Sequence, residues 1–465
     1  MPATVIKVSD VVDRQSIGGF RLKVFLLCAA TLFIEGFDTQ AIAFVSPALS
    51  KAWDLPKGAL GPVFSAGLFG LLCGSLLVAP LADRLGRRKV ILYSALLFGI
   101  LTLATTAASN LGELIAMRFV TGLGLGGAMA NAVALTAEYS PKHRRASIVM
   151  AVFTGFPAGS AVGGFIAAHL IPSLGWEAVF VCAGSLTLGL WLLLLLRLPE
   201  SVCFLALRRD HAPQVARLMA KIDPSLDQAA PLDFVVDEPG AVGITVQHLF
   251  RGAWSRLTPL LWVIYFMSLL NLYLLASWLP TMVHSRGISV EYSVIATALL
   301  QVGGIAGAVI LSLLTGRFGA RRIMPLAYLA AALCIGSISF TGSSVGLTML
   351  AVFWAGFTVI GCQNCNNGLA SIIYPTAFRA TGVGWANGIG RAGSITGPLI
   401  AGFMLTRDAE LSTIYMTGSA AAVVAAIAAL AIGRQWAPSL DAGDGPETAG
   451  SDSAAPAGGL KSSAS

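Results

Sequence analysis

Long apolar segments dominate this chain and restrict it to a membrane fold. A helix that crosses a bilayer needs about 20 apolar residues. Twelve stretches meet this need, at 24–49, 59–82, 90–109, 113–137, 146–170, 175–197, 257–283, 291–315, 323–342, 345–371, 380–405 and 412–432. Only 11% of the 465 residues are charged, whereas a soluble domain carries about 25%. We therefore predict an all-α membrane protein with twelve transmembrane helices.

The longest connection, from 198 to 256, divides the apolar stretches six and six. It contains a predicted amphipathic helix at 212–222 and an acidic, irregular stretch at 223–238. The sequence DRLGRR at 83–88 follows the second stretch, and TGRFGARR at 315–322 follows the eighth. Such internal repeats are typical of two pseudo-symmetric bundles that move around a site at mid-membrane. We predict a terminus at 1–23, bundles at 24–200 and 257–434, a central loop at 201–256 and a disordered tail at 435–465.

The formal net charge of +7 comes from basic residues in short loops. These loops follow even-numbered stretches, which is the positive-inside pattern of a multi-pass membrane protein. They contain Arg84, Arg87, Arg88 and Lys89, then Lys142, Arg144 and Arg145, then Arg317, Arg321 and Arg322. This pattern places both termini in the cytoplasm and explains the charge without nucleic acid as a partner. The seven cysteines are scattered, so we expect free thiols and neither a metal nor another cofactor.

Two acids, Glu35 and Asp38, lie in the middle of the first apolar stretch. An ionisable group there costs about 2.5–3.5 kcal/mol on insertion scales, so it usually has a function. Their spacing of three residues puts both on one helix face. Arg118 lies roughly 8 Å below the outer end of the fourth stretch and Asp38 roughly 15 Å below that of the first, within the reach of arginine. We predict a proton-coupling group of Asp38, Glu35 and Arg118; the alternatives are an ion pair used only for packing and an outward-pointing Arg118.

Arg391 is the second charge that the sequence places near the centre of the membrane. It lies roughly 18 Å along the eleventh stretch from Arg379, which stands at the cytoplasmic mouth. A guanidinium at this depth needs an anion, and its fork geometry suits a carboxylate. That anion is either a span 1 acid or a substrate, and we favour the substrate. The other predicted substrate-binding residues are polar or aromatic residues of neighbouring stretches: Gln301, Asn271, Tyr273, Gln363 and Asn367.

The loop at 83–89 carries a further motif. Gly86 permits a tight turn, and Asp83 stands at a helix end where it can pair with a basic residue in one conformation only. Such a pair acts as a gate, and the predicted gating residues are Asp83, Arg84, Arg87, Arg88, Glu138 and Arg379. Together with the twelve stretches, this loop resembles the signature loop of the major facilitator superfamily, although Ala79 stands where the family usually has Gly.

More specific motifs resemble the aromatic acid:proton symporter branch of that superfamily. EGFD at 35–38 is similar to its D-G-x-D signature, and YPT at 374–376 followed by Arg379 through Arg391 is similar to its span 10–11 signature. LPES at 198–201 and WLP at 278–280 also agree. The branch imports benzoate-like acids, such as 4-hydroxybenzoate and protocatechuate, with protons across bacterial inner membranes. By resemblance, the residues needed for transport are Glu35, Asp38, Asp83, Arg118, Arg379 and Arg391; Glu35 replaces the usual Asp and reaches one methylene further.

We therefore expect a secondary transporter that takes up a small aromatic carboxylate with protons. It is expected to work as a monomer in the lipid bilayer of a bacterial inner membrane. The alternative within the same fold is another cargo, namely a sugar, an organic cation or a non-aromatic organic acid; Arg391 disfavours a cation because like charges repel in a low dielectric. An enzyme or a membrane sensor has little support, since no nucleophile–base pair, metal cluster or signalling domain is recognisable in the sequence.

Overall fold

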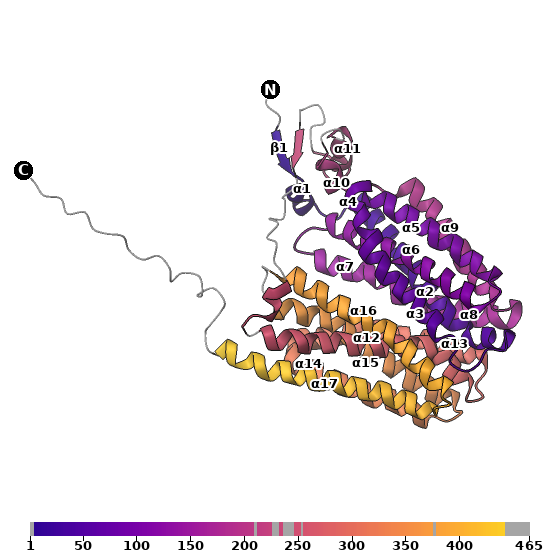
Figure 1. Cartoon of the computed structure of the whole chain (residues 1–465). Coiled ribbons are helices and arrows are strands. Elements are labelled where there is room, and N and C mark those ends of the chain that lie inside the picture. The colour runs from indigo at the N-terminus through magenta and orange to yellow at the C-terminus, as the bar shows by residue number, and fades with distance from the viewer. Residues whose placement is uncertain are drawn as a thin grey trace, which may run out of the picture.

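The computed structural model describes residues 4–208, 212–225, 232–235, 246–252, 254–374 and 378–441. Two helical bundles follow one another along the chain and lie side by side (Figure 1). The first contains α2 (Gly19–Ala52), α3 (Gly61–Cys73), η1 (Gly74–Val78), η2 (Ala79–Leu81), α4 (Ala82–Leu85), α5 (Arg87–Ala104), η3 (Thr105–Ala107), α6 (Leu111–Glu138), α7 (Arg145–Phe153), α8 (Gly155–Leu174) and α9 (Glu177–Arg197). The second contains α12 (Trp254–His284), α13 (Val290–Phe318), α14 (Ala320–Ser337), η6 (Ile338–Phe340), α15 (Val345–Ile373), α16 (Arg379–Thr406) and α17 (Leu411–Asp441).

The elements from α3 to α4 follow one another as one helical segment, and so do α7 and α8. Counted in this way, the described residues contain the expected twelve long helical segments. Within the described residues, ten segments are long and apolar enough to span a bilayer. The segment α2 passes the same test together with the short helix before it, from which it bends by 100°. The twelfth segment is α16, which contains Arg379 and Arg391. The predicted all-α fold of two six-helix bundles is confirmed.

Glycines set the close helix contacts inside each bundle. In the first, α8 crosses α2 so tightly that a Cβ at Gly159 would lie 1.7 Å from the carbonyl oxygen of Phe33. In the second, α13 crosses α15, and a Cβ at Gly307 would lie 1.9 Å from the carbonyl oxygen of Phe357. Small residues let helix backbones approach where lipid gives no hydrophobic driving force between helices.

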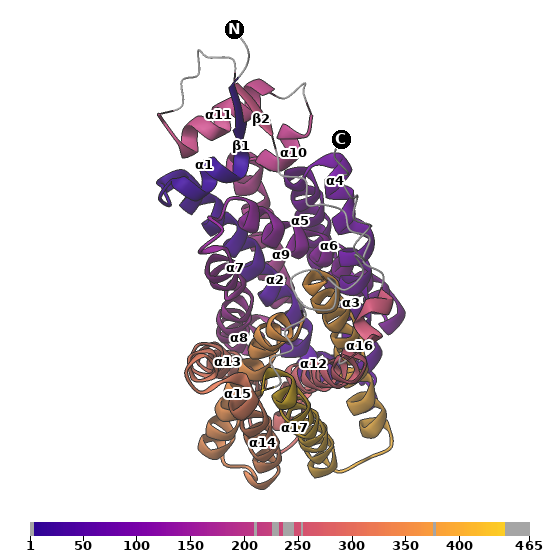
Figure 2. The ribbon, with the colours of Figure 1, turned by 90° about the vertical axis from the view of Figure 1, so that its left-hand side faces the viewer.

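A small cap covers one end of the first bundle (Figure 2). It consists of β1 (Thr4–Lys7), α1 (Val8–Arg14), α10 (Val202–Ala206), α11 (Ala212–Ile222) and β2 (Leu232–Val235). The helix predicted at 212–222 is α11. The expectation of an irregular stretch at 223–238 is wrong for β2, which pairs in parallel with β1 from the chain terminus. A local reading of the sequence misses this strand because its partner lies more than 200 residues away.

The cap shares one hydrophobic core with the first bundle. Val8, Val215 and Phe234 belong to the same buried cluster as Leu32 of α2. Arg21 is buried at the start of α2 and donates to three carbonyl oxygens, including that of Val12 at 2.8 Å. We call this end of the molecule the cap end. The opposite end, which carries the loops at 53–60 and 407–410, is the far end.

The remaining described parts of the chain are a short helix before the second bundle and the end of its last helix. The short helix is η5 (Val246–Phe250), which precedes α12. The tail predicted to be disordered begins at 435, but α17 continues to Asp441, and residues 442–465 lie outside the described residues. All seven cysteines lie in the described part and are free thiols, as expected.

We predict that Gly159→Ala lowers the melting temperature of the detergent-purified protein. The added methyl overlaps a backbone carbonyl, and overpacking of this kind costs about 1–3 kcal/mol. The control is Gly189→Ala in α9, where an added Cβ meets nothing within 4 Å. Intrinsic fluorescence during heating measures both variants. Equal melting temperatures would show that the close α2–α8 contact does not limit stability.

Candidate functional site

A cavity of about 150 Å³ lies between the two bundles. Helices of both bundles contribute its walls. The polar lining residues are Gln40, Thr154, Tyr273, Gln301, Gln363, Asn364, Asn367, Asn387 and Arg391, and the apolar ones include Met129, Phe156, Leu269, Ile305 and Ile360. An apolar protein cavity of about this size holds one benzene ring. The cavity therefore suits a small single-ring molecule that carries polar groups.

Five of the six predicted substrate-binding residues line this cavity together: Arg391, Gln301, Tyr273, Gln363 and Asn367. The structure does not bring Asn271 there. It is buried in α12 beside Gly418 of α17, on the side away from the cavity. Positions two apart on a helix point about 200° apart, so Asn271 and Tyr273 cannot both face one site.

Arg391 reaches across the cavity from the second bundle toward the first. Its Nη2 contacts the Sδ of Met129 in α6 at 3.8 Å. A thioether sulfur is a weak acceptor for a guanidinium. Among the described residues, no carboxylate lies within ion-pair distance of Arg391. The guanidinium is thus half-buried at a cavity and retains donors for an anion.

Amide side chains of α15 and α16, in the same bundle as Arg391, are partly ordered by hydrogen bonds. The Tyr265 hydroxyl donates to Oδ1 of Asn367 at 2.9 Å, and Asn387 donates to the same oxygen at 3.5 Å. Gln363 accepts from Asn366 at 3.1 Å. These contacts leave other donors and acceptors of the amides facing the cavity, where they can bind ring substituents.

Asp38 and Arg118 form a buried ion pair, as their helix positions predict. Nη1 of Arg118 lies 3.5 Å from Oδ2 of Asp38, and Nη2 donates to the backbone carbonyl of Asp38 at 3.0 Å. The hydroxyl of Thr102 in α5 donates to the other carboxylate oxygen at 2.5 Å. The side chains of Asp38 and Arg118 are 0% and 2% exposed, so the pair is screened from water. Asp38 therefore links three helices of the first bundle through polar contacts.

Glu35 lies one turn before Asp38 and is also fully buried. Neither of its carboxylate oxygens has a hydrogen-bond partner among the described residues. Arg391 and Asp38 both act on it electrostatically. A buried carboxylate without partners is costly as an anion, so such a group either carries a proton or pairs with a cation.

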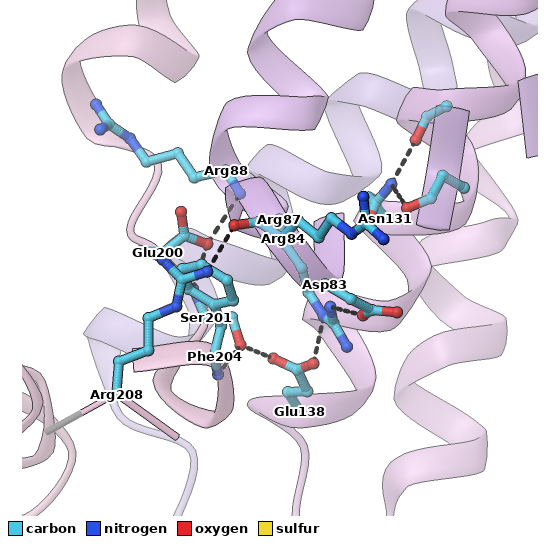
Figure 3. A network of polar contacts seen from close by, with 12 residues as sticks. Asp83, Arg84, Arg87, Arg88, Asn131, Glu138, Glu200, Ser201, Phe204 and Arg208 are labelled. Carbon is cyan, nitrogen blue, oxygen red and sulfur yellow. Dashed lines mark hydrogen bonds and ion pairs between the residues drawn. The ribbon is translucent and has the colours of Figure 1, made fainter. Parts of the chain in front are cut away.

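The predicted gating loop forms a polar network at the cap end (Figure 3). Arg87 pairs with Glu138 at the end of α6 and, at 3.4 Å, with Asp83. Glu138 also accepts from the Ser201 hydroxyl. These contacts join the turn between α4 and α5 to the end of α6 and to the start of α10.

Glu200 extends the network to the turn itself. Its carboxylate accepts from the backbone N–H of Arg88 at 3.0 Å, and a Cβ at Gly86 would lie 2.3 Å from it. Gly86 adopts φ of +96°, a conformation that disfavours other residues. The backbone carbonyl of Arg84 accepts from Arg208 at 2.7 Å. The network lies within the first bundle and the cap.

Arg379 stands apart from the other predicted gating residues. It begins α16 in the second bundle, and its Nε donates to the carbonyl oxygen of Tyr374 at 3.2 Å. The structure therefore brings Asp83, Arg87 and Glu138 together in one network. Arg379 lies in the second bundle and bonds to a nearby carbonyl of its own chain segment. Of the predicted YPT motif at 374–376, Pro375 and Thr376 lie outside the described residues.

At the far end, polar contacts join the two bundles. Lys57 pairs with Asp408 at 2.7 Å across exposed loops, and its hydrogen bond and charge lower the pKa of Asp408. Ser46 of α2 and Thr281 of α12 share a hydrogen bond of 2.7 Å. A Cβ at Gly58 would lie 2.2 Å from the carbonyl oxygen of Gly402, so the backbones touch there. The structure is therefore tightly closed at the far end.

Sequence reasoning missed several residues of these sites. Thr102 gives no sequence signal, because a threonine in an apolar helix more often bonds its own backbone. Asn387 could have been found, since it lies one turn before Arg391 on the same face. Gln40 lines the cavity and donates to the carbonyl oxygen of Ala276 at 3.4 Å, a contact between bundles that no local pattern indicates.

The profile of the Major Facilitator Superfamily matches residues 28–398 and, again, residues 261–447. The first of these matches alone spans well over half of the chain. The chain belongs to the major facilitator superfamily. It is a transporter, not an enzyme.

Relatives of this transporter with known names confirm the predicted branch. The gallate transporter of Pseudomonas putida is 40% identical over 92% of this chain and 95% of its own. The 4-hydroxybenzoate transporter PcaK of Pseudomonas aeruginosa is 39% identical, with coverage of 86% and 90%. The benzoate transport protein of Acinetobacter baylyi is 30% identical, with coverage of 86% and 87%. All three names refer to aromatic acids.

Solved structures support the fold of the transporter. The crystal structure of a D-xylose-proton symporter superposes with a TM-score of 0.67 at 17% identity, covering 88% of this chain and 97% of that one. The inward open conformation of the xylose transporter XylE from E. coli gives 0.66 at 17% identity, with coverage of 90% and 95%. Likeness at this identity concerns the fold alone.

Proposed function

We propose that this transporter takes up an aromatic carboxylate together with protons across a bacterial inner membrane. The observation that carries the proposal is Arg391, a guanidinium at a cavity of single-ring size whose contact there is a thioether. The names of the relatives, which refer to gallate, 4-hydroxybenzoate and benzoate, support the same class of substrate. The basic loops at the cap end support a cytoplasmic location for that end and for both termini.

The cavity offers complementary surfaces for the two parts of an aromatic acid. Arg391 binds the carboxylate through two parallel N–H donors, which is the strongest geometry for this pair. Phe156, Leu269 and Ile360 provide apolar surface for the ring. The amides of Gln301, Gln363 and Asn367 face substituents on the ring. We propose that it works as a monomer, and the fact that a single chain supplies all these groups supports this.

Proton coupling is assigned to the acids of α2. Protonation of Asp38 removes the negative partner of Arg118 and weakens the contact between α2 and α6. Glu35 lies on the same face of α2 as Asp38, and the charge of Arg391 acts on it. When substrate occupies Arg391, the acids hold protons; when the carrier returns empty, Arg391 pairs with a deprotonated acid. Substrate and proton then travel together.

Gating is assigned to the cap-end network. Asp83 is 76% exposed, so its present contact with Arg87 is weak, while the Arg87–Glu138 pair is mostly buried. Closure of the cap end would bring the second bundle, with Arg379, toward this loop. Asp83 then gains a partner in one conformation only, which is the property of a gate.

We expect Asp38→Asn to abolish substrate accumulation driven by a pH gradient, because the amide cannot take up and release the coupled proton. Exchange of internal for external substrate should persist. Proteoliposomes with labelled 4-hydroxybenzoate, benzoate, a sugar and an organic cation measure both activities and also test the substrate class. Asp54→Asn, on an exposed loop, is the matched control. Undiminished accumulation by Asp38→Asn would rule out this role, and uptake of the sugar or cation alone by the parent would refute the proposed substrate.

We expect Arg391→Lys to weaken substrate binding by about 1–3 kcal/mol, because lysine keeps the charge but loses the bidentate fork. Neutral amide analogues of the acid should bind poorly to the parent protein for the same reason. Calorimetric titration of both purified proteins gives the affinities. Arg407→Lys, on the exposed loop after the same helix, should bind like the parent. Equal affinity for acid and amide in both proteins would show that Arg391 does not bind the carboxylate.

We expect Asp83→Asn to lower the maximal transport rate with little change in apparent affinity. The residue lies in α4 at the cap end, away from the cavity, so its loss affects the conformational step rather than binding. Initial uptake rates over a range of substrate concentrations separate the two parameters. A normal maximal rate with a large loss of affinity would place Asp83 in substrate binding instead.

A further inference from the structure

A second, much smaller cavity lies beside Arg118, where α2, α3 and α6 of the first bundle meet α12 of the second. It encloses about 20 Å³, and Thr39, Gly67, Arg118 and Ser277 contribute to its wall. Two lining residues, Gln40 and Tyr273, also line the central cavity. The small cavity therefore lies between the Asp38–Arg118 pair and the central cavity.

Two polar atoms of residues that line this cavity are buried and have no hydrogen-bond partner in the part of the chain that the structure describes. One is Nε of Arg118, whose side chain is 2% exposed; the other is Oγ1 of Thr39. The two terminal nitrogens of Arg118 are directed to Asp38, so Nε–H is a donor that the ion pair does not satisfy. An unsatisfied buried donor on a charged group is costly. A partner between Nε and Oγ1 would remove that cost.

The cavity has the size and chemistry for one water molecule. A cavity needs about 10–15 Å³ of probe-occupied volume to hold a water, which also needs two to four polar partners. This cavity exceeds that volume and is far too small for a substrate. Arg118 offers a donor, Thr39 a hydroxyl, and Ser277 and Gln40 line the same space as further polar groups.

We propose that one ordered water binds here, accepts from Nε–H of Arg118 and donates to Oγ1 of Thr39. This water stabilises the guanidinium when Asp38 is protonated. Protonation leaves Arg118 as a buried cation without its anion, which is strongly destabilising. A water on Nε supplies a partner that does not depend on the charge of Asp38. The second part of this proposal rests on the proposed proton coupling; the binding site itself does not.

The water acts on the pair in its protonated state. Asp38 also has Glu35 on the same helix and the Thr102 hydroxyl from α5 beside it, and Glu35 in turn feels the charge of Arg391 of α16. Tyr273 of α12 lines the small cavity. The other charged or histidine side chains of the helices packed around this site lie toward the helix ends: Arg87, Arg88 and Lys89 in α5, Glu113 and Glu138 in α6, Arg145 in α7, His169 in α8, Glu177 and Arg197 in α9, Arg256 and His284 in α12, and Glu291 and Arg317 in α13, whereas α3 has none.

The chain offers a variant that fills the cavity without a clash. A Cβ at Gly67 would lie 3.7 Å from the carbonyl oxygen of Arg118 and 4.0 Å from its Nε, which are ordinary contacts. Gly67 lines the cavity, so Gly67→Ala adds a methyl group to its wall and reduces the space for a water. Thr39→Val removes the hydroxyl but keeps the side-chain shape, and Thr39→Ser keeps the hydroxyl. Gly189→Ala is the control for a helical glycine that faces open space.

High-resolution crystal structures of the full chain test the site directly. We expect a water within about 2.7–3.2 Å of both Nε of Arg118 and Oγ1 of Thr39 in the parent and in Thr39→Ser. Gly67→Ala should lack it. A parent structure without a water between these atoms would overturn the proposal. This readout does not depend on transport, so it decides the site even if the parent shows no proton coupling.

The pH dependence of transport tests the role. In Gly67→Ala and in Thr39→Val, the pH profile of proton-driven accumulation should move toward acid, because the water no longer stabilises Arg118 when Asp38 is protonated. Thr39→Ser and Gly189→Ala should match the parent. An unchanged pH profile in both test variants would refute the role of the water. Absence of proton-driven accumulation in the parent at every pH would instead refute the proposed coupling.

Discussion

The buried ion pair between Asp38 and Arg118 is the interaction on which the first bundle depends. Both side chains are buried away from bulk solvent, so each charge depends strongly on the other. The pair joins α2 to α6, and Thr102 brings in α5. In a low dielectric, a change in charge on either group alters the helix contacts far more than it would at a surface. A chain that holds such a pair is stable in one protonation state and poised to rearrange in the other.

Arg391 is a further charge in the membrane region, and it lies at the interface between the two bundles. It is a cation that reaches from the second bundle to a thioether of the first. Glu35, on the first bundle, is an acid without hydrogen-bond partners among the described residues. Among the described residues, Arg391 therefore has no carboxylate in ion-pair contact, and Glu35 has no hydrogen-bond donor. In the function that we propose, an anionic substrate binds Arg391 and a proton neutralises Glu35.

Much of this arrangement could be predicted from the sequence, because the membrane imposes simple rules. Apolar length gives the helices, and depth along a helix gives the level of Asp38, Arg118 and Arg391. Depth does not give direction around the helix axis, which depends on packing partners. That is why Asn271 was expected at the cavity and lies instead against α17. The β1–β2 pairing was missed for a related reason, since residues far apart in the sequence form it.

The cap changes what the connection between the bundles can do. Because β2 pairs with β1 and α11 packs in the core of the first bundle, the connection up to Val235 moves with that bundle. At the other end of the connection, Leu249 of η5 shares a buried cluster with Leu257 and Leu261 of α12, so η5 belongs to the second bundle. The part of the connection that joins the two packed bodies is therefore shorter than the whole stretch from 198. Loop-closure entropy rises with length, so a shorter connection costs less to hold together. By pairing with β2, the N-terminal strand β1 thus shortens the connection between the two bundles.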